Sequence, residues 1–519
     1  MDKQTGRDCP DFCGEKSAVC ASSAADAASE ETAAIRSAAA SEGIDISAEI
    51  AASERVIASE ETANQTRGKH FTRSERRGMF REAIDMAWPA VLESFFTSLA
   101  GMIDTMMVSS MGSYAVAAVG LTSQPKFIGL TPFFAVNVAV SALVARRKGE
   151  NNKKSANETL MTALCLSLII CAAVSVIFVV WAEPILRIAG SNEDTHEPAS
   201  AYFRIIMGGT FFSMIQMLFN SAQRGSGNTR ISMTTNVASS ITNICFNYCL
   251  IGGHFGFPAL GCTGAAIATV LGTVVGAAMS FGSLFMKKSY VSLPYIRKEK
   301  IRPKHYDFKI IGKLSSNMLA ENLLMRIGFL VTAFVAARIG TDAFAAHNVG
   351  MNLLGLSFSF ADGMQAAGVA LSGQALGANK KEEAKLYGKI CQKIGAFISA
   401  CIAVILLFGG RGIFRMFFDD PAILDMGVMI SRYICVITFF QISQVIYGAC
   451  LRAAGDVRYT LIASTISVTL IRSAMTILLV YMLNLGLAGI WLGVLSDQLS
   501  RYIFMSIRFR QGKWVNNKF

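Results

Sequence analysis

Charged residues are scarce in this chain of 519 residues. They make up 16% of the sequence, whereas hydrophobic residues make up 52% and the mean hydropathy is +0.44. Soluble proteins carry about a quarter charged residues. So low a charge content excludes an ordinary soluble domain and favours a protein embedded in a lipid bilayer.

Residues that often carry catalysis are few and scattered. The five histidines form no cluster with cysteines or acids at one membrane face, so an enzyme is not expected. The twelve cysteines predict no disulfide framework, because three lie in the first 20 residues and most others lie inside apolar runs. The chain contains no phosphate-binding loop, which argues against an ATP-driven pump, and no nucleic-acid-binding motif.

Long apolar runs account for most of the remaining sequence. Each is long enough to cross a bilayer as a helix, and none alternates strictly between apolar and polar residues as a membrane strand would. The sequence therefore predicts an all-α integral membrane protein with twelve transmembrane helices. The expected spans are 83–108, 116–145, 157–181, 200–222, 232–253, 262–286, 308–338, 343–373, 390–410, 425–450, 460–483 and 487–508.

Basic residues gather in alternate loops. They follow the second, fourth, sixth, eighth and tenth spans, whereas the other loops are rich in acids. By the positive-inside rule, both termini are predicted to be cytoplasmic, with the chain in the cell membrane and its basic loops near anionic lipid headgroups. The excess positive charge is thereby explained without a nucleic-acid partner.

The first 66 residues differ from the rest. They contain 13 acids and 5 bases, are rich in Ala, Ser and Glu, and repeat the block ASEETA at 28–33 and 58–63. This composition predicts a disordered, acidic cytoplasmic tail over 1–66. Residues 67–82 form a basic juxtamembrane collar before the first span.

The remaining chain repeats itself at an offset of 228 residues. This offset relates several separated segments, which indicates a duplicated unit and is typical of a secondary transporter with its pathway between two halves. We predict bundles at 83–286 and 308–510, joined by a cytoplasmic linker at 287–307 and followed by a cytoplasmic C-terminus at 511–519. The repeated residues include Glu93 and Glu321, Gly112 and Gly340, Gly149 and Gly377, Arg224 and Arg452, Gly227 and Gly455, and Arg230 and Arg458.

Several short segments carry a family resemblance. The first span reads Trp88-Pro89-Ala90-Val91-Leu92-Glu93 and later Gly101-Met102-Ile103-Asp104-Thr105. The loop after the fourth span reads 223–230, QRGSGNTR, and the sixth span begins GCTGAAIAT at 261–269. From about residue 80 onward the chain resembles the multidrug and toxic compound extrusion (MATE) family. The resemblance implies two pseudo-symmetric six-helix bundles around a central cavity that opens alternately to either side.

Asp104 is the main candidate for ion coupling. An intramembrane carboxylate is costly unless it is buried in protein or faces water. Asp104 could instead lie at the headgroups, but the resemblance implies a cation site made by Asp104, Asn243, Asn247 and Thr269. One family branch has an aspartate where this chain has Asn247, so a Na⁺ site here would rely on amide and hydroxyl oxygens. The two asparagines could equally join helices by hydrogen bonds.

A second group of candidates lies in the other half. Another family branch uses a glutamate on the seventh helix and an aspartate on the tenth. Here Glu321 falls about one turn early, and the tenth span offers Gln441 rather than an aspartate. Glu321 could therefore belong to a coupling site, or it could simply neutralise Arg326 on the same helix. Glu93, the repeat mate of Glu321, could be structural for the same reason.

The resemblance implies an antiporter that exports amphipathic, cationic organic compounds in exchange for H⁺ or Na⁺. No cofactor, metal or nucleic acid is expected beyond that coupling ion, and a monomer in contact with membrane lipids is predicted. A flippase for a lipid-linked precursor has a similar architecture, but its lumen should hold several cationic residues for phosphate, and few Arg or Lys lie within these spans. A membrane receptor or scaffold remains an alternative, although it would not explain the duplication.

Overall fold

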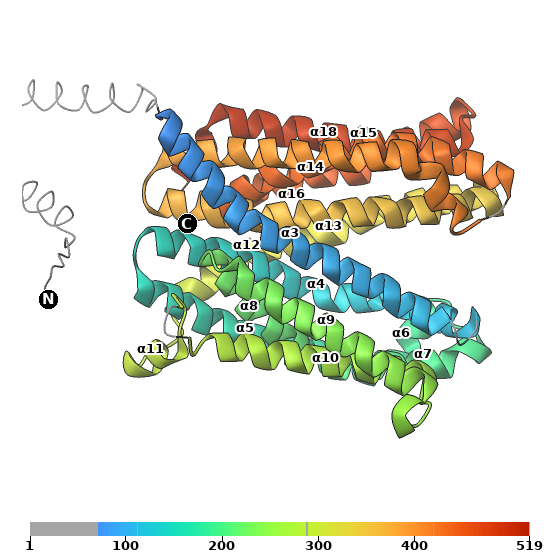
Figure 1. The fold of residues 1–519 in the computed structure, drawn as a ribbon, viewed down its shortest axis with the longest axis horizontal. Coiled ribbons are helices and arrows are strands. Elements are labelled where there is room, and N and C mark those ends of the chain that lie inside the picture. Colours follow the sequence, from blue (N-terminus) through green and yellow to red (C-terminus); the bar gives the residue numbers. More distant parts are fainter. Residues whose placement is uncertain (1–70, 110, 112, 287–288, 419, 518–519) are drawn as a thin grey trace, which may run out of the picture. The chain divides into compact units, whose positions relative to one another are not determined.

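The computed structural model describes residues 71–109, 111, 113–286, 289–418 and 420–517. The prediction for the acidic tail at 1–66 and the first four residues of the basic collar, 67–70, lie outside this part. Every regular element of the described chain is helical. Figure 1 shows these helices, α3 to α18, and the expected helical fold is confirmed.

Each of the twelve predicted spans corresponds to a helical element. Eight described helices are long and apolar enough to cross a membrane, and a ninth span results if the bent pair α7–α8 is counted as one. The more polar α9, α13 and α18 are not among the eight. The helices of the first half are α3 (Arg73–Ser109), α4 (Ser113–Gly149), α5 (Lys153–Val180), α6 (Ala182–Ile188), α7 (Glu193–Gly208), α8 (Thr210–Gly225), α9 (Thr229–Gly252) and α10 (Gly261–Ser283). A short α11 (Leu293–Lys298) lies in the predicted linker, and the second half contains α12 (His305–Ile339), α13 (Thr341–Gly377), α14 (Lys381–Arg415), α15 (Pro421–Ala453), α16 (Val457–Thr465), α17 (Ser473–Ile477) and α18 (Gly486–Gln511).

Two spans are broken. Helices α7 and α8 meet at Gly209 with a bend of 45°. The eleventh span continues from α16 through the π-helical turns Ile466–Arg472 and Leu478–Met482, with α17 between them. A π-helical turn widens the helix locally and changes which side chains face its neighbours.

The repeat extends to the backbone of the turns. Asn151 and Asn379, which are 228 positions apart, both adopt the left-handed conformation, with φ of 53° and 57°. Gly227 and Gly455 do the same, with φ of 84° and 80°. Asparagine and glycine are the residues that tolerate this conformation, so both halves end corresponding helices by the same local device.

The two halves exchange their first helices. We call the end with the loops at 149–153, 225–229, 377–381 and 453–457 the basic end, and the other end the opposite end. At the basic end, Ala83 and Met86 of α3 pack in a core otherwise built from the second half, whereas Val108 at the far end of α3 packs within the first half. Figure 1 shows α3, in blue, crossing between the two sets of helices. Helix α12 mirrors it: Ile311 packs with the first half and Val335 with the second.

The halves are therefore closed together at the basic end. Buried clusters there combine residues of both halves, including one of Ala142, Val369, Ala449 and Ala453. Among the described residues, the clusters at the opposite end each belong to a single half. This distribution is the one expected for a state that is shut at the basic end and open at the opposite end.

Two repeat-related glycines allow this closure. A Cβ added at Gly149 would lie within 3.0 Å of the backbone of Gln374, and one at Gly377 would lie within 3.0 Å of the backbone of Arg146. Gln374 and Arg146 are themselves related by the 228-residue offset, so α4 and α13 meet through a self-complementary contact. Only glycine permits backbones to approach so closely.

Replacing Gly377 by valine should keep the basic end from closing, because the new side chain would clash with the backbone of α4. Cysteines introduced at Ala142 and Val369 should form an oxidative cross-link in the parent chain and lose most of it in Gly377→Val. Gly312→Val is the matched control, because nothing lies within 4 Å of its Cβ position. Equal cross-linking in all three proteins would contradict the proposed glycine contact.

Candidate functional site

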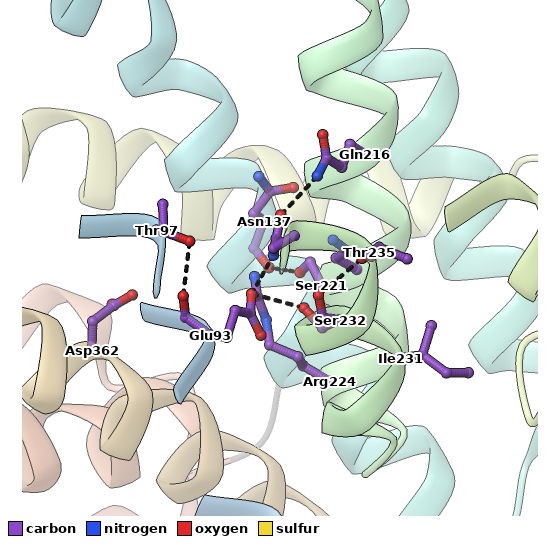
Figure 2. A network of polar contacts seen from close by, with 12 residues as sticks. Glu93, Thr97, Asn137, Gln216, Ser221, Arg224, Ile231, Ser232, Thr235 and Asp362 are labelled. Carbon is purple, nitrogen blue, oxygen red and sulfur yellow. Dashed lines mark hydrogen bonds and ion pairs between the residues drawn. The ribbon is translucent and has the colours of Figure 1, made fainter. Parts of the chain in front are cut away.

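A buried polar network surrounds Glu93, which lies in the middle of α3. Arg224 Nη1 is 2.8 Å from Glu93 Oε1, and Ser232 Oγ donates to the same oxygen at 2.9 Å. Asn236 Nδ2 also donates to this oxygen. The three partners come from the end of α8 and the start of α9. Figure 2 shows two of them, Arg224 and Ser232, beside Glu93. Glu93 is 5% exposed, and its Oε2 has no hydrogen-bond partner among the described residues.

The second half contains the same network around Glu321. Arg452 Nη2 is 2.8 Å from Glu321 Oε1, Ser464 Oγ donates to that oxygen at 2.8 Å, and Thr460 Oγ1 donates to Oε2 at 3.3 Å. Each partner sits 228 positions after its counterpart around Glu93. The two networks thus tie the first helix of each half to the helices on either side of that half's repeated turn.

The suggested neutralisation of Glu321 by Arg326 is wrong. Arg452 pairs with Glu321, while the Arg326 guanidinium lies over the ring of Phe127 on α4, 3.6 Å from its centroid. Residues five apart on a helix point about 140° away from each other, so the two side chains on α12 diverge. Arg326 instead makes a contact between the two halves, through the attraction of a cation for an aromatic face.

The four predicted cation-site residues lie together near the opposite end of α3. Asn247 Nδ2 donates to Asp104 Oδ1, and the Asn243 amide is 3.2 Å from Thr269 Oγ1. With the Asn243 oxygen turned toward Thr269, its nitrogen donates to Asp104 Oδ1 at 3.2 Å. Helices α3, α9 and α10 therefore converge on one carboxylate, within the first half alone.

This cluster retains an unused acceptor. Asn247 is fully buried, and its Oδ1 has no hydrogen-bond partner among the described side chains. A buried acceptor without a partner costs free energy, about 1–3 kcal/mol. An oxygen of this kind beside a half-buried carboxylate is a ligand that a proton donor or a hard cation can use.

Sequence reasoning missed Lys126. This half-buried lysine on α4 acts electrostatically on Asp104. It was detectable, because a lysine between Pro125 and Phe127 interrupts an otherwise apolar span. A cation at Lys126 offsets part of the negative charge at Asp104 and so competes with any ion that binds there.

The second half replaces this cluster with a closed ion network. The repeat mates of Asp104 and Thr269 are Thr332 and Asp497. Arg472 Nε donates to Thr332 Oγ1 at 3.0 Å, and Asp497 pairs with Arg472 at 3.5 Å and with Arg501 at 2.8 Å. With two guanidinium groups beside Asp497, this network has no need of a further cation. The two halves therefore have different chemistry at equivalent positions.

The candidate Gln441 and the buried His347 have no described hydrogen bond to these clusters. Gln441 on α15 is buried, its Oε1 has no described hydrogen-bond partner, and no described bond links it to Glu321 or Arg326. His347 is buried and packs against Trp491, 5.6 Å between ring centroids. In the described part of the chain, no three His, Cys, Asp or Glu side chains gather as a metal site would require.

The duplicated fold and its paired networks agree with a comparison against protein families. The family model MatE matches residues 89–249 and again 318–478, which together make up more than half of the chain. The chain belongs to the MATE family. The double match also supports the internal repeat.

Curated relatives extend over most of the chain. A probable multidrug resistance protein NorM of Thermotoga maritima is 27% identical over 84% of this chain and 93% of its own length. Multidrug resistance protein PmpM of Pseudomonas aeruginosa is 25% identical over 74% of this chain and 81% of its own. An uncharacterized transporter of Bacillus subtilis, YisQ, is 25% identical over 83% of this chain and 94% of its own length.

Solved MATE structures share the fold. One described as MATE in complex with MaD3S superposes with a TM-score of 0.77 at 22% identity, covering 84% of this chain and 97% of its own. An outward-facing MATE transporter of the MOP superfamily gives the same TM-score and coverage at 23% identity. The twelve-helix MATE architecture applies to this chain.

Removing Arg224 should destabilise this MATE protein more than removing an exposed arginine. Arg224→Met would leave the Glu93 carboxylate buried without a counter-charge, which costs about 3 kcal/mol or more. Arg204→Met breaks the exposed pair with Glu183 and should cost less than about 1 kcal/mol. Thermal unfolding in detergent measures both. Adding Glu93→Gln to Arg224→Met should restore part of the lost stability, and a double variant no more stable than the single one would contradict this account.

Proposed function

We propose that this MATE protein is a secondary antiporter. It exports amphipathic organic compounds by alternating access in exchange for H⁺ or Na⁺, and cationic compounds are the expected substrates. The names of its relatives NorM and PmpM support multidrug export. The duplicated halves, shut at one end and separate at the other, support alternating access.

The observation that carries ion coupling is the cluster at Asp104. Its carboxylate receives amide donors from α9, while the buried oxygen of Asn247 remains available. Asp104, Asn243, Asn247 and Thr269 would supply only oxygen ligands to Na⁺, the type that hard cations prefer. Alternatively, a proton on Asp104 could be donated to that oxygen. We assign no role in coupling to Gln441, because no described bond connects it to a carboxylate.

A cation at Asp104 would change how α3 interacts with its neighbours. The same helix carries Glu93, which holds the ends of α8 and α9 through Arg224, and it crosses to the second half at the basic end. Neutralising Asp104 removes one charge from this helix and can therefore shift the balance between its two arrangements. One charge moving through a potential of 100 mV supplies about 2.3 kcal/mol.

The orientation in the membrane is part of the proposal. With both termini and the basic end in the cytoplasm, the structure corresponds to a state open to the outside. The protein would work as a monomer in the cell membrane, with its basic loops against anionic lipids. No cofactor enters this mechanism, since the ion gradient supplies the free energy.

Asp104→Asn should abolish uphill efflux, because the side chain keeps its size but loses the charge that binds the ion. Purified protein in vesicles, with a pH gradient or a Na⁺ gradient imposed separately, would measure this and identify the ion. Asp425→Asn is the matched control, because it makes the same change at an exposed carboxylate. Uphill transport by Asp104→Asn equal to that of the parent chain would refute the coupling role.

A further inference from the structure

One face of α13 is exposed along much of its length. Asn348, Asn352, Gly355, Phe358 and Asp362 recur at intervals of three or four residues, and all five are exposed. Nothing lies within 4 Å of a Cβ added at Gly355. This exposed α13 face runs from the opposite end to beyond the middle of the helix.

Water, rather than lipid, is the medium that this face meets. Helix α13 packs against α3, α4 and α8 of the first half and against α12, α14 and α15 of the second, so it is central in the molecule. Two asparagines and an aspartate on a lipid-facing surface would be left without partners, at a cost of several kcal/mol. On α4, Gly120 and Gln124 are exposed at the positions equivalent to Asn348 and Asn352.

Asp362 is the last residue of the exposed α13 face, and it lies inside the protein. Directly after it, α13 touches α3 so closely that a Cβ on Gly363 would lie 2.5 Å from Val91 Cα. Farther along, the contact at Gly377 closes α13 against α4. Asp362 is thus the last exposed residue before the halves seal, although it lies deep inside the protein.

The charge around Asp362 is not balanced. Its electrostatic neighbours include Arg224 and Arg452, but each of these arginines is already paired with a buried glutamate. The described hydrogen bond of Asp362 comes from Gln365 Nε2, at 3.0 Å. Figure 2 shows Asp362 close to Glu93 but outside the bonds that join Glu93 to its partners. Two glutamates, two arginines and one aspartate leave a net charge of −1 at the base of an exposed face.

We propose that Asp362 binds the cationic group of the exported compound. This inference rests on the proposed function and specifies its substrate subsite: a protonated amine or delocalised organic cation at Asp362, with an apolar or aromatic body against Phe358, which is 44% exposed. Phe358 lies one turn before Asp362 on the same face, within reach of a single ligand. Gln365 holds the carboxylate without neutralising it.

This arrangement separates substrate recognition from ion coupling. Asp362 lies on α13 of the second half and Asp104 on α3 of the first, and these two helices pack against each other. Substrate and ion would then act on the same conformational equilibrium from different sites, rather than by displacing each other from one carboxylate. Substitution of Asp362 should therefore weaken substrate binding, whereas substitution of Asp104 should remove ion coupling.

Binding of ethidium, a planar fluorescent cation, to purified full-length protein tests the proposal without any ion gradient. Asp362→Asn should weaken ethidium binding about tenfold or more, because a charge-assisted contact is lost. Asp362→Glu should retain much of the affinity, and Asp425→Asn, which makes the same change at an exposed carboxylate, should bind like the parent chain. Asp362→Ser replaces Asp362→Asn if the latter does not elute as a folded monomer.

Unchanged ethidium affinity in a folded Asp362→Asn or Asp362→Ser protein would overturn the proposal. A parent chain that binds an anionic dye of similar size in preference to ethidium would also overturn it. Lys126 and Arg326 would then be the candidate binding residues. Neither result touches the proposed ion-coupled export, which fails separately if the parent protein in vesicles does not respond to a pH or Na⁺ gradient. A preference for the anionic dye would, however, correct the expected substrate class.

Discussion

Charge buried within a bilayer must be paired or must face water, and this constraint organises the whole molecule. Each half meets it first with a glutamate on its opening helix, held by an arginine at the end of its fourth span. The arginine precedes a turn that closes with a left-handed glycine in both halves. Since the pairing joins residues 131 positions apart in sequence, it fixes the opening helix against the rest of its half.

Beyond these two pairs, the halves diverge in what they do with charge. The first half places Asp104 among amides and a hydroxyl, whereas the second has Thr332 at that position and surrounds Asp497, the repeat mate of Thr269, with two guanidinium groups. At these equivalent positions Asp497 is already paired with two arginines, whereas the Asp104 cluster is the one that we propose binds a cation. Under that proposal, an ion gradient would act on the first half only.

Much of this architecture follows from the sequence. Apolar runs in the sequence mark all twelve spans, although α9, α13 and α18 are less apolar than the others. The fixed offset alone relates Glu93 to Glu321. The cluster of Asp104, Asn243, Asn247 and Thr269 is reachable only through resemblance, because its members lie on three helices far apart in sequence. Arg326 is the wrong partner for Glu321, since proximity along a helix says little when the side chains diverge around it. Lys126 can be recognised in the sequence as a charge inside an apolar run, whereas no sequence pattern indicates the exchange of α3 between the halves.

That exchange has a consequence for how the chain is made. The basic end of α3 shares a buried core with residues as late as Met505 and Trp514 and packs directly against α13, so the first of the described transmembrane segments completes its contacts only when the second half has been made. Until then, Glu93 of α3 can pair with Arg224, but the face of α3 that packs against α13 has no partner helix. A chain interrupted before α13 would leave that face of α3 exposed, where membrane quality control could recognise it.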